Sequence, residues 1–134
     1  MAKIIDIEGI GETYAKKLAG AGVTTTGRLL KVAASAAGRK DLADQADVTT
    51  KQVLEWVNRA DLMRINGVGT QYSDLLEASG VDTVVELATR NAENLWKKMT
   101  ELNATKRLVR QVPSLEQVKD WVAQAGDLPR VVSH

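Results

Sequence analysis

The sequence contains no cysteine and no phenylalanine, and its single histidine is the last residue, His134. Without cysteine the chain can form neither a disulfide nor a thiolate nucleophile. Without an internal histidine it can hold neither a histidine-based catalytic triad nor a common zinc site. We therefore expect a protein that is not an enzyme and that needs no metal and no other cofactor.

Aromatic residues and prolines are also scarce, at 4% and two residues, whereas apolar residues make up 44% of the 134 positions. Such a composition favours helices over sheets, because strands are enriched in aromatic and β-branched residues. A chain of this length forms one domain or two very small ones. Any second domain must therefore be small or a repeat of the first.

Neither sign of charge dominates, since 18 lysine and arginine residues face 17 aspartate and glutamate residues, a net charge of +1. This balance creates no general field that would hold a nucleic acid or an anionic membrane, so any such binding must come from a local patch. No stretch approaches the roughly 20 apolar residues that span a bilayer, and the start has no apolar run of the secretory type. We expect a cytoplasmic protein without a membrane partner.

The chain matches itself at a constant spacing. Residues 7–25 align with residues 65–83 without a gap, at an offset of 58 positions. The match resumes where residues 53–57 align with residues 118–122 at an offset of 65, so the second copy carries seven extra residues. Chance does not produce such a match, and the chain is interpreted as a tandem duplication.

Apolar spacing and capping residues predict helices in both copies, and no run of alternating β-branched residues competes with them. The helices are expected after Gly11, after Gly69 and after Asn91, and near residues 27–37, 40–46, 50–63, 83–90 and 115–125. The three tryptophans recur among apolar neighbours and are expected in the core. The predicted fold is all-α, with a first helical repeat at residues 1–60 and a second, carrying the seven-residue insertion, at residues 61–134. We expect the two repeats to pack as one body.

A glycine-apolar-glycine triplet opens each copy: Gly9-Ile10-Gly11 (hairpin one) and Gly67-Val68-Gly69 (hairpin two). With the short amphipathic helix that follows, each triplet resembles the helix-hairpin-helix motif of SAM-like folds. Glycines permit a tight turn, the central apolar side chain fills the core, and amides at the start of the next helix can bind phosphate. The alternative is that the glycines only form a tight corner. In either case we expect Gly69→Val to destabilise the fold by about 1 to 3 kcal/mol.

The residues around the two hairpins differ in charge. Glu8 and Glu12 bracket hairpin one and would repel a phosphate, whereas Thr70 and Gln71 beside hairpin two are neutral donors with Arg64 close by. Hairpin two is therefore the stronger candidate for nucleic-acid binding and hairpin one the weaker.

Lyase-type DNA glycosylases with helix-hairpin-helix motifs carry a lysine two residues beyond the second hairpin glycine. Here Thr13 and Gln71 occupy those positions, so the catalytic resemblance fails. This agrees with the expectation that the chain is not an enzyme.

A local excess of positive charge lies at residues 97–110, which contain five basic residues and one acidic residue. The basic residues are Lys97, Lys98, Lys106, Arg107 and Arg110. A basic patch in this region, which also holds the insertion, could add phosphate contacts beside hairpin two. The alternative is a solvated helix face without a ligand.

A series of short motifs between residues 48 and 132, among them Glu55-Trp56-Val57, the hairpin-two triplet and Pro113-Ser114-Leu115, resembles the bacterial domain-of-unknown-function family 4332. The resemblance covers nearly the whole chain. It implies a soluble bacterial protein with tandem helix-hairpin-helix repeats, for which DNA binding is inferred from the hairpins. It implies no reaction and no ligand.

Two functions remain open. The first is non-catalytic binding of DNA, weak and without sequence preference, through hairpin amides and the local basic patch. Its expected residues are Arg64, Gly67, Val68, Gly69, Thr70, Gln71, Lys97, Lys98, Lys106, Arg107 and Arg110, with Gly9, Ile10 and Gly11 as the weaker set. The second is a protein-interaction module in which the repeats form a docking surface.

Overall fold

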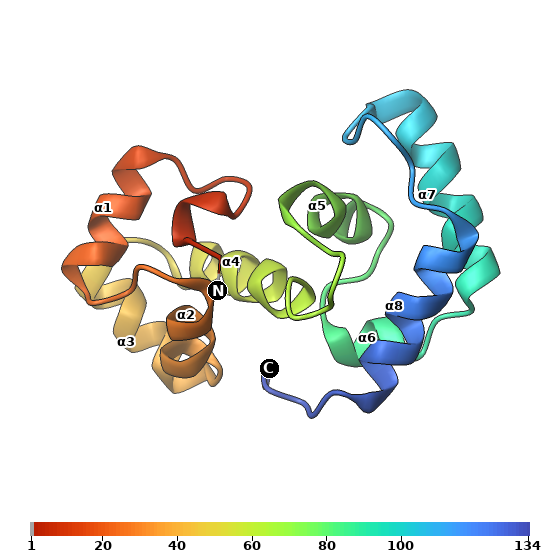
Figure 1. Cartoon of the computed structure of the whole chain (residues 1–134). Helices are drawn as coiled ribbons and strands as arrows, with labels where there is room; N and C mark the ends of the chain where they lie inside the picture. The colour runs from red at the N-terminus through yellow and green to blue at the C-terminus, as the bar shows by residue number, and fades with distance from the viewer. Residues whose placement is uncertain (1) are drawn as a thin grey trace. The chain divides into compact units, whose positions relative to one another are not determined.

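The computed structural model describes residues 2–134, and every regular element in them is helical (Figure 1). The elements are the 3-10 turn η1 (Ile4–Asp6) and the helices α1 (Glu12–Gly20), α2 (Thr26–Ala33), α3 (Ala36–Ala46), α4 (Thr50–Leu62), α5 (Thr70–Ala78), α6 (Val84–Ala88), α7 (Ala92–Lys106) and α8 (Leu115–Asp127). Strand-like pairing in these residues is limited to one isolated antiparallel bridge between Lys3 and Thr25. The all-α prediction is confirmed. In the same described part, no helix is both long and apolar enough to cross a membrane.

The chain divides into two compact units. The first includes the residues up to Asp61 together with Val131–His134, and the second is Leu62–Arg130. The sequence analysis assigned all residues after 60 to the second repeat, whereas the last four residues return to the first unit. Within the second unit, α6 and α7 each pack against α8.

Side-chain caps decide where several helices begin. Thr83 caps α6, and Ser114 forms a full capping box with Gln117 at the start of α8, as their spacing predicts. The helix expected near residues 27–37 is wrong at its end, because α2 ends at Ala33 and α3 begins at Ala36. The Ser35 hydroxyl accepts a hydrogen bond from the Gly38 amide at 3.1 Å and starts α3 at Ala36.

The two glycines of each hairpin have different backbone conformations. Gly9 and Gly67 come first and are left-handed, with φ of 90° and 97°. Gly11 and Gly69 come second and are extended N-caps, with φ of −87° and −100°. Any residue can adopt an extended conformation, and a Cβ at Gly69 would meet nothing within 4 Å. The expectation that Gly69→Val strains the hairpin is therefore wrong, because the left-handed position that requires glycine is Gly67.

Each unit contains a tyrosine from the helix after its hairpin that packs against a tryptophan later in the chain. The rings of Tyr14 and Trp56 lie 5.3 Å apart at 55°, and those of Tyr72 and Trp121 lie 5.2 Å apart at 53°. Both tryptophans are buried in the core, as expected, whereas the third, Trp96, is only partly buried. Val68, 4% exposed, also lies in the core of the second unit, as expected for the central residue of hairpin two.

The C-terminal residues are held by Arg39. The Arg39 guanidinium, in a side chain only 5% exposed, donates to the carbonyls of Ala33, Ala34 and Ser133 at 3.2, 2.9 and 2.7 Å. The Ser133 amide in turn donates to the Ala34 carbonyl at 2.9 Å. Burial lowers the pKa of Arg39, but the ordinary value is so high that the group stays charged at neutral pH.

Candidate nucleic-acid interface

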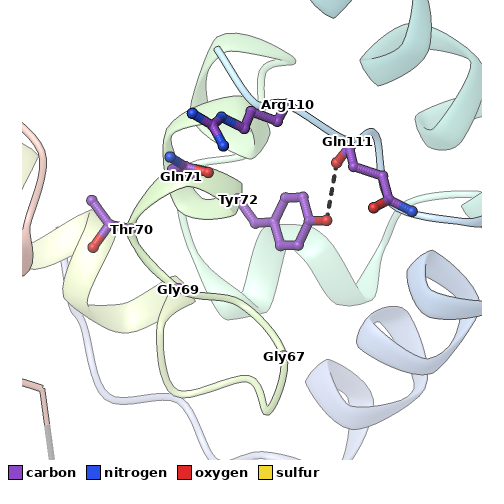
Figure 2. Close-up of a pocket in the computed structure, with 7 residues that line it drawn as sticks. All are labelled: Gly67, Gly69, Thr70, Gln71, Tyr72, Arg110 and Gln111. Atoms are coloured by element: carbon purple, nitrogen blue, oxygen red, sulfur yellow. Dashed lines mark hydrogen bonds between the residues drawn. The ribbon is translucent and has the colours of Figure 1, made fainter.

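A hollow of about 440 Å³ lies at hairpin two (Figure 2). We call it the hairpin-two hollow, and its lining residues are Gly67, Gly69, Thr70, Gln71, Tyr72, Arg110 and Gln111. Five of these were expected to bind nucleic acid from the sequence. The structure therefore brings hairpin two together with one residue of the basic segment.

The first turn of α5 forms one wall of this hollow. An α-helix N-terminus presents unpaired N–H groups and a partial positive charge. The N-cap is Gly69, which has no side chain to cap these amides or to fill the space above them. This helix start can therefore attract an anion, although most of the surface that lines the hollow is apolar.

Two amides of the hairpin-two segment are already used inside the protein. The Val68 N–H donates to the Ile65 carbonyl at 3.1 Å, and the Asn66 N–H donates to the Gln124 side chain at 2.9 Å. Because the Val68 side chain is in the core and its amide is paired, Val68 offers neither of these groups to a ligand. Its role is to hold the hairpin.

Arg110 reaches the hollow from the loop that follows α7. In Figure 2 its guanidinium points toward the start of α5, where Gln71 also lies. A second hollow of about 540 Å³ shares Arg110 and Gln71 with the first. Its other lining residues are Asn103, Arg107, Leu108 and Val109. Arg107 and Arg110 are both exposed, so two guanidinium groups border adjoining hollows beside α5.

The remaining basic residues of the expected set lie elsewhere in the second unit. Arg64 donates to the Pro129 carbonyl at 2.8 Å. Lys97 forms an ion pair with Glu93 at 3.6 Å, and Lys98 lines a separate hollow with Arg90. None of these three basic residues lines either hollow beside α5.

Lys106, the last residue of α7, is exposed but does not line these hollows either. The expected patch of five bases therefore narrows to Arg107 and Arg110.

As for metals, the described residues contain no group of three His, Asp or Glu side chains placed to hold an ion.

Comparison with known proteins gives one family. The family model described as "Domain of unknown function (DUF4332)" matches residues 8–128. The chain belongs to this family. It matches neither a curated protein nor a solved structure. The resemblance seen in the sequence is thus confirmed at the level of the family.

Hairpin one of this DUF4332 chain is built like hairpin two but differs in its surroundings. The Ile10 side chain is buried, and its N–H donates to the Ile7 carbonyl at 3.1 Å. Glu8 and Glu12 are exposed on either side of the triplet. Arg59 donates to the Glu8 backbone carbonyl at 3.0 Å, and the acidic side chains leave hairpin one electrostatically poor for a phosphate.

Sequence reasoning missed two residues of the hairpin-two hollow in the DUF4332 chain, Tyr72 and Gln111. The Tyr72 hydroxyl donates to the Gln111 carbonyl at 3.0 Å (Figure 2). The amphipathic character of tyrosine, with an apolar ring and a polar tip, was the available indication. Nothing local in the sequence indicates that Gln111 reaches the hairpin.

Proposed function

We propose that this protein is a non-catalytic nucleic-acid-binding protein whose hairpin two grips the sugar-phosphate backbone without reading base sequence. The observation that carries the proposal is the hairpin-two hollow, in which the first turn of α5 and Arg110 line one space. Helix N-termini and guanidinium groups are two of the most frequent protein ligands of phosphate. Because the proposed partner is DNA, we also propose that the protein is cytoplasmic. The family resemblance implies a bacterial source.

We also propose that the two units are tandem helix-hairpin-helix repeats of the SAM-like type. Support comes from local geometry that both units share. A left-handed first glycine and an extended second glycine at the N-cap recur 58 residues apart, and each unit has a tyrosine–tryptophan pair with the same ring distance to 0.1 Å. After the next helix, the Val23 and Val81 amides each donate to a leucine carbonyl at 2.9 Å. Two unrelated corners would not be expected to share all of these features.

Binding of this kind should be weak, because the net charge is only +1 and few phosphates are contacted. We expect a Kd on the order of 10⁻⁴ to 10⁻⁶ M near physiological salt. The logarithm of affinity should fall against the logarithm of salt concentration with a slope of roughly −2 to −5. Duplexes of different sequence should bind alike.

The decisive variant is Gly69→Asp, compared with Gly11→Asp as its matched control. Both glycines are extended N-caps with open space where a Cβ would stand, and aspartate is a favoured N-cap, so both variants should fold. A carboxylate at position 69 would cap the amides of α5 and repel phosphate. We expect Gly69→Asp to lose about tenfold or more in affinity and Gly11→Asp to change little.

The measurement is fluorescence anisotropy of a labelled duplex titrated from about 20 mM salt upward, where electrostatic attraction is least screened. Circular dichroism should verify that each variant is folded. Absence of wild-type binding at the lowest salt would contradict the proposal, and so would equal affinities of the two aspartate variants.

The arginines give a second, independent test. Replacement of Arg110 by alanine should reduce the magnitude of the salt slope by about one, whereas Lys97→Ala should leave it unchanged. Lys97 is the suitable control because it is basic and exposed but paired with Glu93, away from the hollow.

The second candidate function, protein docking, draws on a different surface in the first unit. A groove of about 500 Å³ there has mostly apolar walls. Its lining residues are Lys3, Ile4, Ile5, Glu12, Ala15, Lys16, Ala19, Thr24 and Thr25. Ile5, which is 44% exposed, contributes a large apolar side chain to this groove. If the wild type does not bind nucleic acid, this function becomes the leading one.

A further inference from the structure

The two units differ most in the connection that carries Arg110. In the first unit, α3 ends at a left-handed Asp47 (φ 54°), and Val48 alone separates it from Thr49, whose side chain caps α4. In the second unit, α7 ends at a left-handed Arg107 (φ 51°), and six residues, 108–113, separate it from Ser114, the cap of α8. The loop is therefore five residues longer in the second unit, and α7 has 15 residues where α3 has 11. Part of this gain is offset by α6, which has 5 residues where α2 has 8.

The loop of residues 107–113 is tied to the second unit by a buried amide side chain. Asn103 of α7, only 8% exposed, donates from Nδ2 to the Val109 carbonyl at 3.0 Å and accepts at Oδ1 from the Val109 N–H at 3.0 Å. Both backbone groups of Val109 are therefore paired with one side chain. The first unit has Val48 bonded to the backbone carbonyl of Ala43 instead, without a side chain in this role.

Two more side chains hold the same loop at alternate residues. The Tyr72 hydroxyl of α5 donates to the Gln111 carbonyl at 3.0 Å, and the Trp96 indole of α7 donates to the Pro113 carbonyl at 3.0 Å. The loop is thus anchored at residues 109, 111 and 113. Arg110 lies between two anchored residues, at a bend of the chain, with its side chain exposed toward the hollow.

We propose that Asn103 and Tyr72 are positioning residues for nucleic-acid binding, which hold Arg110 at hairpin two through the loop backbone. This inference rests on the proposed function. A free six-residue loop would lose conformational entropy whenever Arg110 bound a phosphate. In this protein the anchors order the loop on folding, so the guanidinium is already placed when the ligand arrives. Hairpin one has no equivalent loop, which also explains why hairpin two is the binding site.

The test is a double-mutant cycle between Tyr72→Phe and Arg110→Ala, measured by duplex anisotropy at low salt. Tyr72→Phe removes only the hydroxyl that holds Gln111 and keeps the ring that packs on Trp121. We expect Tyr72→Phe to weaken binding about threefold to tenfold in the wild-type background and to have no effect when Arg110 is alanine. Its salt slope should also move toward that of Arg110→Ala.

Tyr14→Phe is the matched control. Tyr14 has the same ring relationship with Trp56, but its hydroxyl accepts from the Gln52 side chain at 3.0 Å and lies in the first unit. It should leave affinity unchanged. Asn103→Ala, if it folds, should behave like Tyr72→Phe, and hydrogen exchange at the Val109 amide should quicken in it.

The outcomes separate this inference from the function on which it rests. If Arg110→Ala weakens binding while Tyr72→Phe binds like the wild type, the positioning role is overturned and the proposed function stands. An equal loss from Tyr72→Phe in both backgrounds also overturns it, because the hydroxyl would then act independently of Arg110. Failure of the wild type to bind would overturn both.

Discussion

Trp121 lies directly against Gly67, so a Cβ atom built on this glycine would come within 3.1 Å of the indole Nε1. Gly67 is also left-handed, with φ of 97°. In the first unit, Gly9 and Trp56 have the same relationship with a looser separation of 4.0 Å. The Trp121 indole therefore packs against the hairpin turn. Gly67 is needed both for its backbone conformation and for its lack of a side chain.

Gly67→Ala should destabilise the protein by about 1 to 3 kcal/mol, because alanine at a positive φ is strained and its methyl group would press on Trp121. Gly69→Ser is the control, since serine suits an extended N-cap and should change stability by less than about 0.5 kcal/mol. Urea unfolding followed by tryptophan fluorescence measures both. Similar midpoints for the two variants would show that the hairpin is not shaped as described.

Gly38→Ala should also destabilise, although this exchange inside a helix normally stabilises by about 1 kcal/mol. A Cβ at Gly38 would stand 2.2 Å from the backbone carbonyl oxygen of Val32, which cannot yield without moving α2. Gly126→Ala in α8 meets nothing within 4 Å and should stabilise by a few tenths to about 1 kcal/mol. The two variants should shift the thermal midpoint in opposite directions, and a shift in the same direction would contradict the close approach of α2 to α3.

Ser79→Ala should be neutral or stabilising by up to about 1 kcal/mol. The Ser79 hydroxyl is fully buried and has no hydrogen-bond partner among the described residues, so its desolvation is not compensated. Ala21 occupies the matching position of the first unit. Ser73, equally buried, donates to the Thr70 carbonyl at 2.8 Å, and Ser73→Ala should cost about 0.5 to 1.5 kcal/mol. A lower denaturant midpoint for Ser79→Ala than for Ser73→Ala would refute this prediction.

Arg39→Met should release the C-terminal residues. Methionine fills a similar volume but lacks the donors to the carbonyls of Ala33, Ala34 and Ser133. Each hydrogen bond from a charged donor contributes at most about 1.5 to 3 kcal/mol to the free energy of unfolding. We expect faster carboxypeptidase trimming and faster exchange of the Ser133 amide. Lys40→Met, at an exposed neighbour, should change neither rate. Resistance of Arg39→Met to trimming would mean that the remaining contacts, among them the Ser133 bond to Ala34 and the burial of Val132, are enough to hold these residues.

Sequence reasoning succeeded where the interactions are local. The box of Ser114 with Gln117, and the caps at Thr83 and Asn91, join residues three apart, so their spacing is sufficient to predict helix starts. It failed at Gly69, because Gly67 and Gly69, separated by a single residue, look equivalent in the sequence while only Gly67 is left-handed. It failed again at the C-terminus, because the partner of Ser133 is Arg39, far away along the chain.

The sequence by itself determined the helical class and predicted the duplication and the likeness of the two hairpins, since helix periodicity, capping and repetition are visible over a few residues. It also contained both parts of the candidate site, hairpin two and a run of five bases. Only the tertiary structure decided that Arg107 and Arg110 border the hollows beside α5 and that Lys97 and Lys98 do not. The physical reason is that the position of a loop side chain depends on where the backbone is anchored, and the anchors of this loop, Asn103 and Tyr72, come from two helices that meet only in the folded chain.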